Sequence, residues 1–131
     1  MITYSPSNKN DELVYIGSPE DLGAKTLSGS EIKLYARVDF GGGDSPLTTG
    51  LFEVTKGSFS FTYPFNELAT LIEGELEITD ESGNSVTYKG GDGRSWFINK
   101  GATVIWHVKS ATARKSFFSA TTDIDKRGTH Q

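Results

Sequence analysis

The stretch FTYPFNELATLIEGELEITDESGN, residues 61–84, contains two apolar strand patterns and two turn signals. Residues 67–73 (ELATLIE) are mostly apolar, and in residues 75–79 (ELEIT) charged and apolar side chains alternate. Such alternation is typical of a strand with one buried face. Gly74 separates the two segments, and the polar run 80–84 (DESGN) is typical of a hairpin turn. The stretch therefore predicts successive short strands joined by tight turns.

The same kind of pattern continues along the chain in both directions. Further short strands are expected at residues 32–37, 50–55, 58–63, 85–89, 94–98, 103–109 and 114–120. Lys56 and Gly57 predict a turn between two of these strands. A short helix is predicted after Ser18, which precedes Pro19 and two acidic residues. Many short strands with almost no helix predict an all-β sandwich or barrel.

Composition and charge narrow the classes of function. The chain of 131 residues has the length of a single domain. Its formal net charge is −4 and its basic residues are scattered, which argues against a nucleic-acid partner. It contains no cysteine, so disulfides, thiolate metal sites and cysteine nucleophiles are excluded. We see neither a signal peptide nor an apolar run of membrane-spanning length, and we therefore expect a cytoplasmic protein with no membrane partner.

The spacing around Glu67 resembles the first of two short motifs of the cupin superfamily, G-x5-H-x-H-x3/4-E-x6-G. Six residues separate Glu67 from Gly74, as this motif requires. Counting back from Glu67 places Phe61 and Tyr63 where the motif has its paired histidines. The second motif, G-x5-P-x-G-x2-H-x3-N, fits from Gly93 onward with Asn in place of Pro, and its histidine position falls on Val104.

Other segments resemble the cupin branch that includes the ethanolamine-utilisation protein Q and the (S)-ureidoglycine aminohydrolase-like cupins. These segments include Gly50-Leu51-Phe52-Glu53, Tyr63-Pro64-Phe65-Asn66-Glu67, Thr79-Asp80, Gly91-Asp92 and Arg114-Lys115. The resemblance implies a cupin (jelly-roll) β-barrel over residues 31–120. Residues 1–30 are then an N-terminal arm or extension, and residues 121–131 are a polar C-terminal tail. It also implies a homodimer formed by sheet packing and exchange of an N-terminal strand.

Strand parity indicates which side chains face the interior of such a barrel. Phe61 and Tyr63 lie on the apolar face of their strand, and Trp106 lies on that of another, whereas His107 points away. The remaining histidine, His130, lies in the polar tail. Because a transition-metal site usually needs three or four N, O or S ligands, we expect no bound metal and no cofactor.

Glu67 is then the main candidate for chemistry. A carboxylate among aromatic side chains loses hydration, which raises its pKa and suits it to act as a general base or acid. Tyr63 is the second catalytic candidate, because its hydroxyl can hold or protonate a substrate oxygen. The candidate ligand-binding residues are Phe61, Val104 and Trp106 on the cavity wall, and Lys100 at a turn near the barrel mouth, where it can attract a polar or anionic ligand.

Each of these residues also has a purely structural interpretation. Glu67 can cap a backbone turn beside Pro64, the aromatic side chains can fill a core, and Lys100 can be a solvated turn residue. The chemical and the structural interpretations together leave three candidate functions. The chain is a metal-independent small-molecule enzyme, a binding or sensing module without turnover, or a structural cupin that acts through an oligomer.

Overall fold

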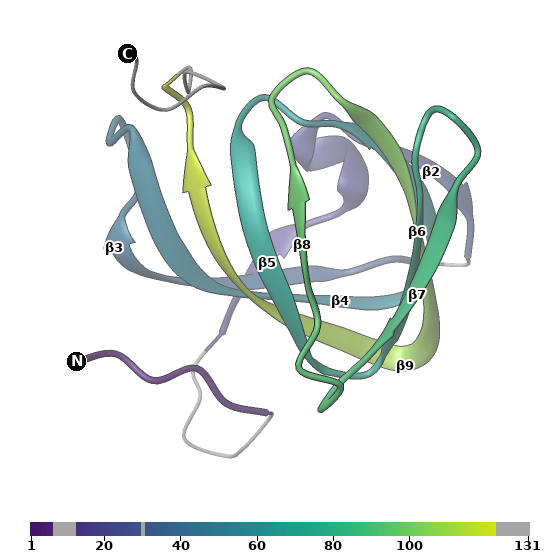
Figure 1. Ribbon diagram of the computed structural model, residues 1–131, viewed down its shortest axis with the longest axis horizontal. Coiled ribbons are helices and arrows are strands. Elements are labelled where there is room, and N and C mark those ends of the chain that lie inside the picture. The colour runs from purple at the N-terminus through teal and green to yellow at the C-terminus, as the bar shows by residue number, and fades with distance from the viewer. Residues whose placement is uncertain (7–12, 30, 123–131) are drawn as a thin grey trace, which may run out of the picture.

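The computed structural model describes residues 1–6, 13–29 and 31–122, which form one antiparallel β-barrel (Figure 1). Its elements in chain order are β1 (Val14–Gly17), the 3-10 helix η1 (Pro19–Leu22), β2 (Lys25–Ser28), β3 (Leu34–Gly41), β4 (Leu47–Thr62), β5 (Asn66–Glu73), β6 (Glu75–Thr79), β7 (Ser85–Lys89), β8 (Ser95–Ile98) and β9 (Thr103–Ala120). The architecture confirms the predicted all-β, single-domain cupin fold. No helix in the described ranges is long and apolar enough to cross a membrane.

Strand β9 connects the two halves of the barrel. The hydrogen-bonded order is β1-β3-β4-β9-β5-β8, while β2 pairs with β4, and β6 pairs with both β7 and β9. The first half of β9 pairs with β6 and its second half pairs with β5, so that one strand passes through both halves. Figure 1 shows β4 and β9 sweeping side by side beneath the shorter strands. These two long strands place residues from distant parts of the sequence around one interior.

Two pairs of predicted strands are continuous in the structure: residues 50–55 with 58–63 in β4, and residues 103–109 with 114–120 in β9. The predicted turn at Lys56-Gly57 is therefore wrong. It is instead a bulge, because the register between β4 and β9 shifts between Thr55 and Gly57. Gly57 has a φ of 147°, which a residue with a Cβ rarely adopts, so glycine lets the strand bend while its pairing continues.

The bulge reverses which residues of β4 face the interior. Before Gly57, the even-numbered residues Phe52 and Val54 contact the core. After Gly57, the odd-numbered residues Phe59 and Phe61 do so. Here β4 advances two residues, from Thr55 to Gly57, while β9 covers four, from Val108 to Thr112, and an irregularity of this kind can exchange the two faces of a strand with a period of two. The bulge therefore brings both ends of β4 to line the same interior with aromatic side chains.

Residues 13–29, which fall in the predicted N-terminal extension, pack on the barrel. β1 pairs with β3, β2 pairs with β4, and the predicted helix is present as η1. The Ser18 N–H donates to Asp21 Oδ2 at 2.9 Å, and Pro19 is buried. Residues 7–12 and most of the predicted tail, 123–131 with His130, lie outside the described residues.

Trp106 and His107 take the opposite orientations that parity predicts for neighbouring residues. Trp106 belongs to the core and is 2% exposed. His107 is exposed, and its Nδ1 lies 3.6 Å from Glu77 Oε1 on the neighbouring strand β6. This orientation confirms the prediction that His107 points away from the barrel interior.

Candidate functional site

A cavity of about 380 Å³ lies inside the barrel, and its mostly apolar wall includes several aromatic rings. The rings come from β4, from the turn that follows it and from β9: Phe52, Phe59, Phe61, Phe65, Trp106 and Phe117. Small-molecule sites typically have volumes of about 300–1,000 Å³ and mostly apolar walls with a few polar groups. The cavity therefore has the size and lining of a site for a small organic molecule.

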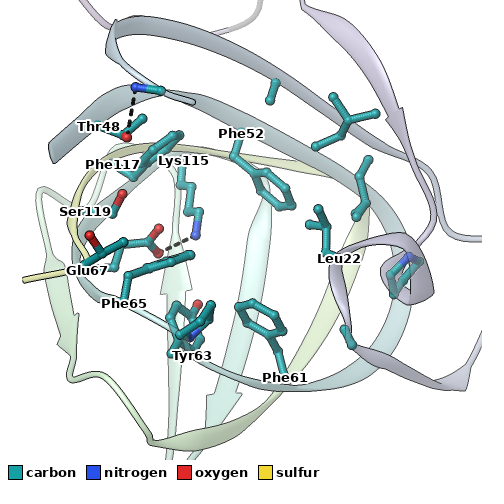
Figure 2. Close-up of a pocket in the computed structure, with 18 of the residues that line it drawn as sticks. Leu22, Thr48, Phe52, Phe61, Tyr63, Phe65, Glu67, Lys115, Phe117 and Ser119 are labelled. Atoms are coloured by element: carbon teal, nitrogen blue, oxygen red, sulfur yellow. Dashed lines mark hydrogen bonds and ion pairs between the residues drawn. The ribbon is translucent and has the colours of Figure 1, made fainter. Parts of the chain in front are cut away.

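Lys115 and Glu67 form an ion pair inside this cavity (Figure 2). Lys115 Nζ donates to Glu67 Oε1 at 2.5 Å, and the two side chains are only 7% and 4% exposed. They come from the neighbouring strands β9 and β5. Burial strengthens the attraction between the two charges and makes either one costly without the other. The site therefore contains one buried, mutually dependent pair of charges.

Aromatic rings also surround the Lys115 ammonium. Its Nζ lies 4.6 Å from the ring centroid of Trp106 and 5.0 Å from that of Phe52. The Phe117 and Tyr63 rings follow at 5.9 and 6.0 Å. A cation within about 6 Å of an aromatic face is attracted by the negative face of the ring. The rings and the carboxylate together fix the ammonium in the cavity.

Tyr63 is almost fully buried beside this pair. The turn after β4 holds its backbone, because the Tyr63 N–H donates to Ala102 O at 2.9 Å and Tyr63 O accepts from Gly101 N at 2.8 Å. Burial raises the pKa of the Tyr63 hydroxyl well above its ordinary value of 10.0, and the Glu67 carboxylate raises it further, against a smaller lowering by the Trp106 side chain. At neutral pH Tyr63 is therefore a phenol that can donate a hydrogen bond, not a phenolate base.

The cavity has a polar and an apolar side. Figure 2 shows Glu67, Ser119 and Thr48 on one side of the cavity and Leu22 on the opposite side. Thr48 Oγ1 accepts a hydrogen bond from the Gly42 N–H at 3.2 Å, which orients its hydroxyl oxygen. A ligand that fills the cavity would meet polar groups at one end and hydrocarbon at the other.

Four of the six predicted site residues line the cavity: Phe61, Tyr63, Glu67 and Trp106. Val104 does not line it. Instead it pairs with Phe61 across β4 and β9 and is buried in the core. Lys100 does not line the cavity either; it lies in the exposed turn between β8 and β9, where its Nζ donates at 3.3 Å to the backbone O of Thr121, a lining residue. The turn that carries Lys100 is held by its backbone N–H, which donates to Asn66 Oδ1 at 2.9 Å.

The sequence interpretation missed Lys115 as a site residue. In RKSFFSA, residues 114–120, two adjacent phenylalanines leave the parity of the strand undecided. Lys115, Phe117 and Ser119 line the cavity, whereas Phe118 is exposed. Arg114 points to the other face, where its Nε donates to Glu53 Oε1 at 2.9 Å. Only the pairing of β9 with β4 and β5 decides which of the two basic residues enters the cavity.

The donor set does not fit the metal site typical of cupins. Phe61, Tyr63 and Val104 occupy the positions where the cupin motifs have histidines, and Glu67 is engaged by Lys115. In the described ranges, no group of three or more His, Cys, Asp or Glu side chains is arranged to hold an ion. An ammonium 2.5 Å from the carboxylate occupies the place where a cation would bind it. No step of the chemistry below is therefore assigned to a metal.

Comparison with known proteins agrees with this fold. A family model described as the EutQ-like cupin domain matches residues 41–117, which include Glu67 and Lys115. A search of curated proteins finds no match.

Solved structures show the same architecture. The EutQ protein of Clostridium difficile is 27% identical with a TM-score of 0.58, over 70% of this chain and 65% of that one. A protein of unknown function from Pseudomonas syringae pv. tomato is 23% identical with a TM-score of 0.70, over 86% of this chain and 46% of that one. A putative ethanolamine utilization protein Q from Salmonella typhimurium is 20% identical with a TM-score of 0.57, over 86% and 96%. The chain thus spans less than two thirds of the length of the Clostridium difficile and Pseudomonas syringae proteins.

Proposed function

The chain belongs to the EutQ-like cupin family, and because one barrel fold supports many unrelated activities, we propose from its own cavity that it is a metal-independent enzyme acting on a small molecule. Glu67 is the acid–base group in this proposal, and Lys115 and Tyr63 assist it. The observation that carries the proposal is the buried Lys115–Glu67 pair inside an aromatic cavity. A protein core rarely keeps two charges in such surroundings without a use for them, because well-packed apolar residues would be about as stable.

The pair suits proton transfer next to a carbonyl group. Lys115 Nζ can donate to the carbonyl oxygen of a substrate, and the Tyr63 hydroxyl can donate to the same oxygen. Glu67 then takes a proton from the adjacent carbon, and the electron pair of the C–H bond moves towards the oxygen, where the ammonium stabilises the enolate. Return of the proton to the opposite face of that carbon inverts its configuration, and protonation of the oxygen gives the enol. The reaction needs neither an oxidant nor a reductant.

A second candidate is a binding module without turnover. The feature that favours it is the same ion pair, because Lys115 already satisfies Glu67 and four rings surround Lys115. A pair whose charges already balance can orient a ligand without transferring a proton. Binding and turnover are therefore measured separately.

Proton exchange tests catalysis without knowledge of the natural substrate. Small aldehydes and ketones are incubated with the protein in D₂O, and NMR follows the loss of the hydrogens next to the carbonyl. We expect the protein to accelerate exchange for at least one compound, and Glu67→Gln to reduce the rate by about 100-fold or more, as expected for loss of a general base. Glu75→Gln, on strand β6 and away from the cavity lining, is the matched control and should keep the rate.

Ligand binding is read from tryptophan fluorescence. The chain has two tryptophans, of which Trp106 lines the cavity and Trp96 does not. A bound ligand should change the emission of the Trp96→Phe variant, which retains Trp106. Binding without exchange in any compound would contradict the proposed catalysis and leave the binding module.

We also propose that two copies of the chain form a dimer through the outer face of the barrel. The support is a row of side chains that face one another across neighbouring strands. The row runs from β3 through β4, β9 and β5 to β8, and its residues in that order are Phe40, Thr49, Phe118, Leu68 and Phe97. All of them except Thr49 are exposed and apolar. The adjacent positions on β9, β5 and β8 are uncharged, namely Ser116, Thr70 and Ser95. Since each copy carries a net charge of −4, a row of uncharged side chains is where two copies can approach with the least repulsion.

A further inference from the structure

We infer that the cavity selects a neutral ligand with a carbonyl head group and an apolar body, and discriminates against the carboxylate of the same shape. This inference names the substrate class of the proposed function and rests on that function for its site. It differs from the sequence-based expectation of a polar or anionic ligand, which depended on Lys100. Lys100 does not line the cavity, and the two charged side chains that do line it, Lys115 and Glu67, have opposite signs.

The charges that line the cavity sum to zero. Among the lining residues in the described part of the chain, Lys115 and Glu67 are the two that carry a formal charge at neutral pH. Each is the other's partner at 2.5 Å. The next basic residue along β9, Arg114, bonds to Glu53 on the opposite face of the sheet. A carboxylate in the cavity would therefore add a negative charge that no lining cation remains to balance.

The surroundings make such an extra negative charge costly. Burial removes the water that would solvate it, and the Glu67 carboxylate repels it. The faces of Trp106 and Phe52, which attract the Lys115 ammonium, carry the negative side of the ring quadrupole and repel an anion. The Glu67 carboxylate and the ring faces around the Lys115 ammonium thus favour a cation or a neutral molecule over an anion.

A neutral carbonyl group suits the polar side of the cavity. Lys115 has three N–H donors, of which Glu67 Oε1 accepts one, so a carbonyl oxygen can accept another while the ion pair persists. An N–H or O–H beside that carbonyl can donate to the second oxygen of Glu67. The ligand body then extends towards Leu22, which lies across the cavity from Glu67 (Figure 2).

Amide and carboxylate pairs of equal shape test the inference directly. The probes are hexanamide against hexanoate and phenylacetamide against phenylacetate, titrated at neutral pH and followed by the fluorescence of the Trp96→Phe variant. We expect each amide to bind at least about tenfold more tightly than its carboxylate, which corresponds to about 1.4 kcal/mol. Equal or tighter binding of the carboxylates would overturn the inference. So would a failure of both members of both pairs to bind.

Removing one charge of the pair should reverse the preference. In Glu67→Gln the Lys115 ammonium loses its counter-charge, so the carboxylates should gain about tenfold or more in affinity while the amides change little. In Lys115→Met, hexylammonium should gain affinity in place of hexanoate. Carboxylate affinities that do not rise in a folded Glu67→Gln variant would contradict the inference. If neither variant folds, the comparison of amides with carboxylates on the protein that keeps both Lys115 and Glu67 still decides.

The outcome is independent of catalysis. Tight amide binding without proton exchange in any carbonyl compound would refute the proposed enzyme and leave the ligand class intact. Proton exchange that depends on Glu67 but acts best on an anionic compound would do the reverse.

Discussion

Lys115 and Glu67 matter to the stability of the fold as well as to its chemistry. Each is a charged side chain in an interior that contains few other polar groups, and each is compensated by the other at 2.5 Å. The aromatic rings around Lys115 add attraction, but they do not replace a counter-charge. The effect of changing one residue therefore depends on whether its partner is still present.

Removing one charge should cost much more than removing both. We expect Lys115→Met to lower the free energy of unfolding by about 3–5 kcal/mol, because it leaves Glu67 buried and unpaired. The double variant Lys115→Met/Glu67→Gln should recover most of this loss, since no uncompensated charge remains. Urea unfolding of both single variants and the double variant measures the coupling between the two residues.

The control for this cycle is Lys89→Met on strand β7. Lys89 is exposed, so its replacement should change the stability by no more than about 0.5 kcal/mol. A Lys115→Met variant as stable as this control would show that Glu67 is not held as a buried charge by Lys115.

Tyr63 should make the stability fall at high pH. Burial, and then the Glu67 carboxylate, raise the pKa of its hydroxyl well above 10.0. As the pH rises past 10.0, the unfolded chain releases this proton and the folded chain keeps it, so the folded state binds more protons and stability decreases with pH. The contribution of Tyr63 is therefore complete below pH 10.0 and is lost between that value and the raised folded-state pKa.

Replacing the hydroxyl should remove this loss. Urea unfolding over a series of alkaline pH values should show a shallower decline for Tyr63→Phe than for the wild type. Tyr15→Phe is the control, because Tyr15 is exposed and its replacement should leave the decline unchanged. Equal declines in the wild type and Tyr63→Phe would mean that the Tyr63 hydroxyl ionises as readily in the folded chain as in the unfolded one.

At the scale of the elements, the bulge at Gly57 determines what the barrel contains. A Cβ at this position would lie 2.6 Å from Ile32 Cδ1 and 2.9 Å from Ser28 O, and its φ of 147° is unfavourable for any side chain. The position thus requires glycine for two separate reasons. Without the bulge, Phe59 and Phe61 would not share the interior with Phe52.

Substitution at the bulge should therefore be costly. We expect Gly57→Ala to destabilise the fold by about 2–3 kcal/mol, through crowding and backbone strain together. Gly83→Ala is the matched control, since Gly83 has a φ of 91° but no atom within 4 Å of a built Cβ, and should cost only about 1 kcal/mol of backbone strain. Thermal and urea unfolding measure both. Equal costs would mean that the neighbours of Gly57 move aside freely.

At the scale of the whole molecule, the apolar row on the outer face predicts the state of association. We expect Leu68→Glu to convert a dimer into a monomer, because two copies related by a twofold axis would place this charge within the apolar contact. Size-exclusion chromatography with light scattering gives the mass. Ile105→Glu is the control, since Ile105 is also exposed but lies outside the row, and the dimer should persist. A monomeric wild type at micromolar concentration would contradict the proposed dimer.

The sequence by itself determined the fold and one part of the site. Alternating strands and tight turns define an all-β barrel, because those patterns depend only on neighbouring residues. Parity placed Phe61, Tyr63 and Trp106 on the barrel interior, and the resemblance of the Glu67–Gly74 spacing to the cupin motif placed Glu67 beside them. Parity gave the direction of these three aromatic side chains because a period of two determines it within one strand.

Only the tertiary structure decided that Lys115 enters the cavity and that Lys100 and Val104 do not line it. The two adjacent phenylalanines of β9 leave its parity open, and the bulge at Gly57 reverses the parity of β4, so the interior face follows from the pairing between strands. The charge of the site was likewise undetermined, because Glu67 alone predicts an acid whereas Glu67 with Lys115 is a neutral pair. Contacts between residues 48 positions apart depend on strand register, which local sequence patterns do not specify.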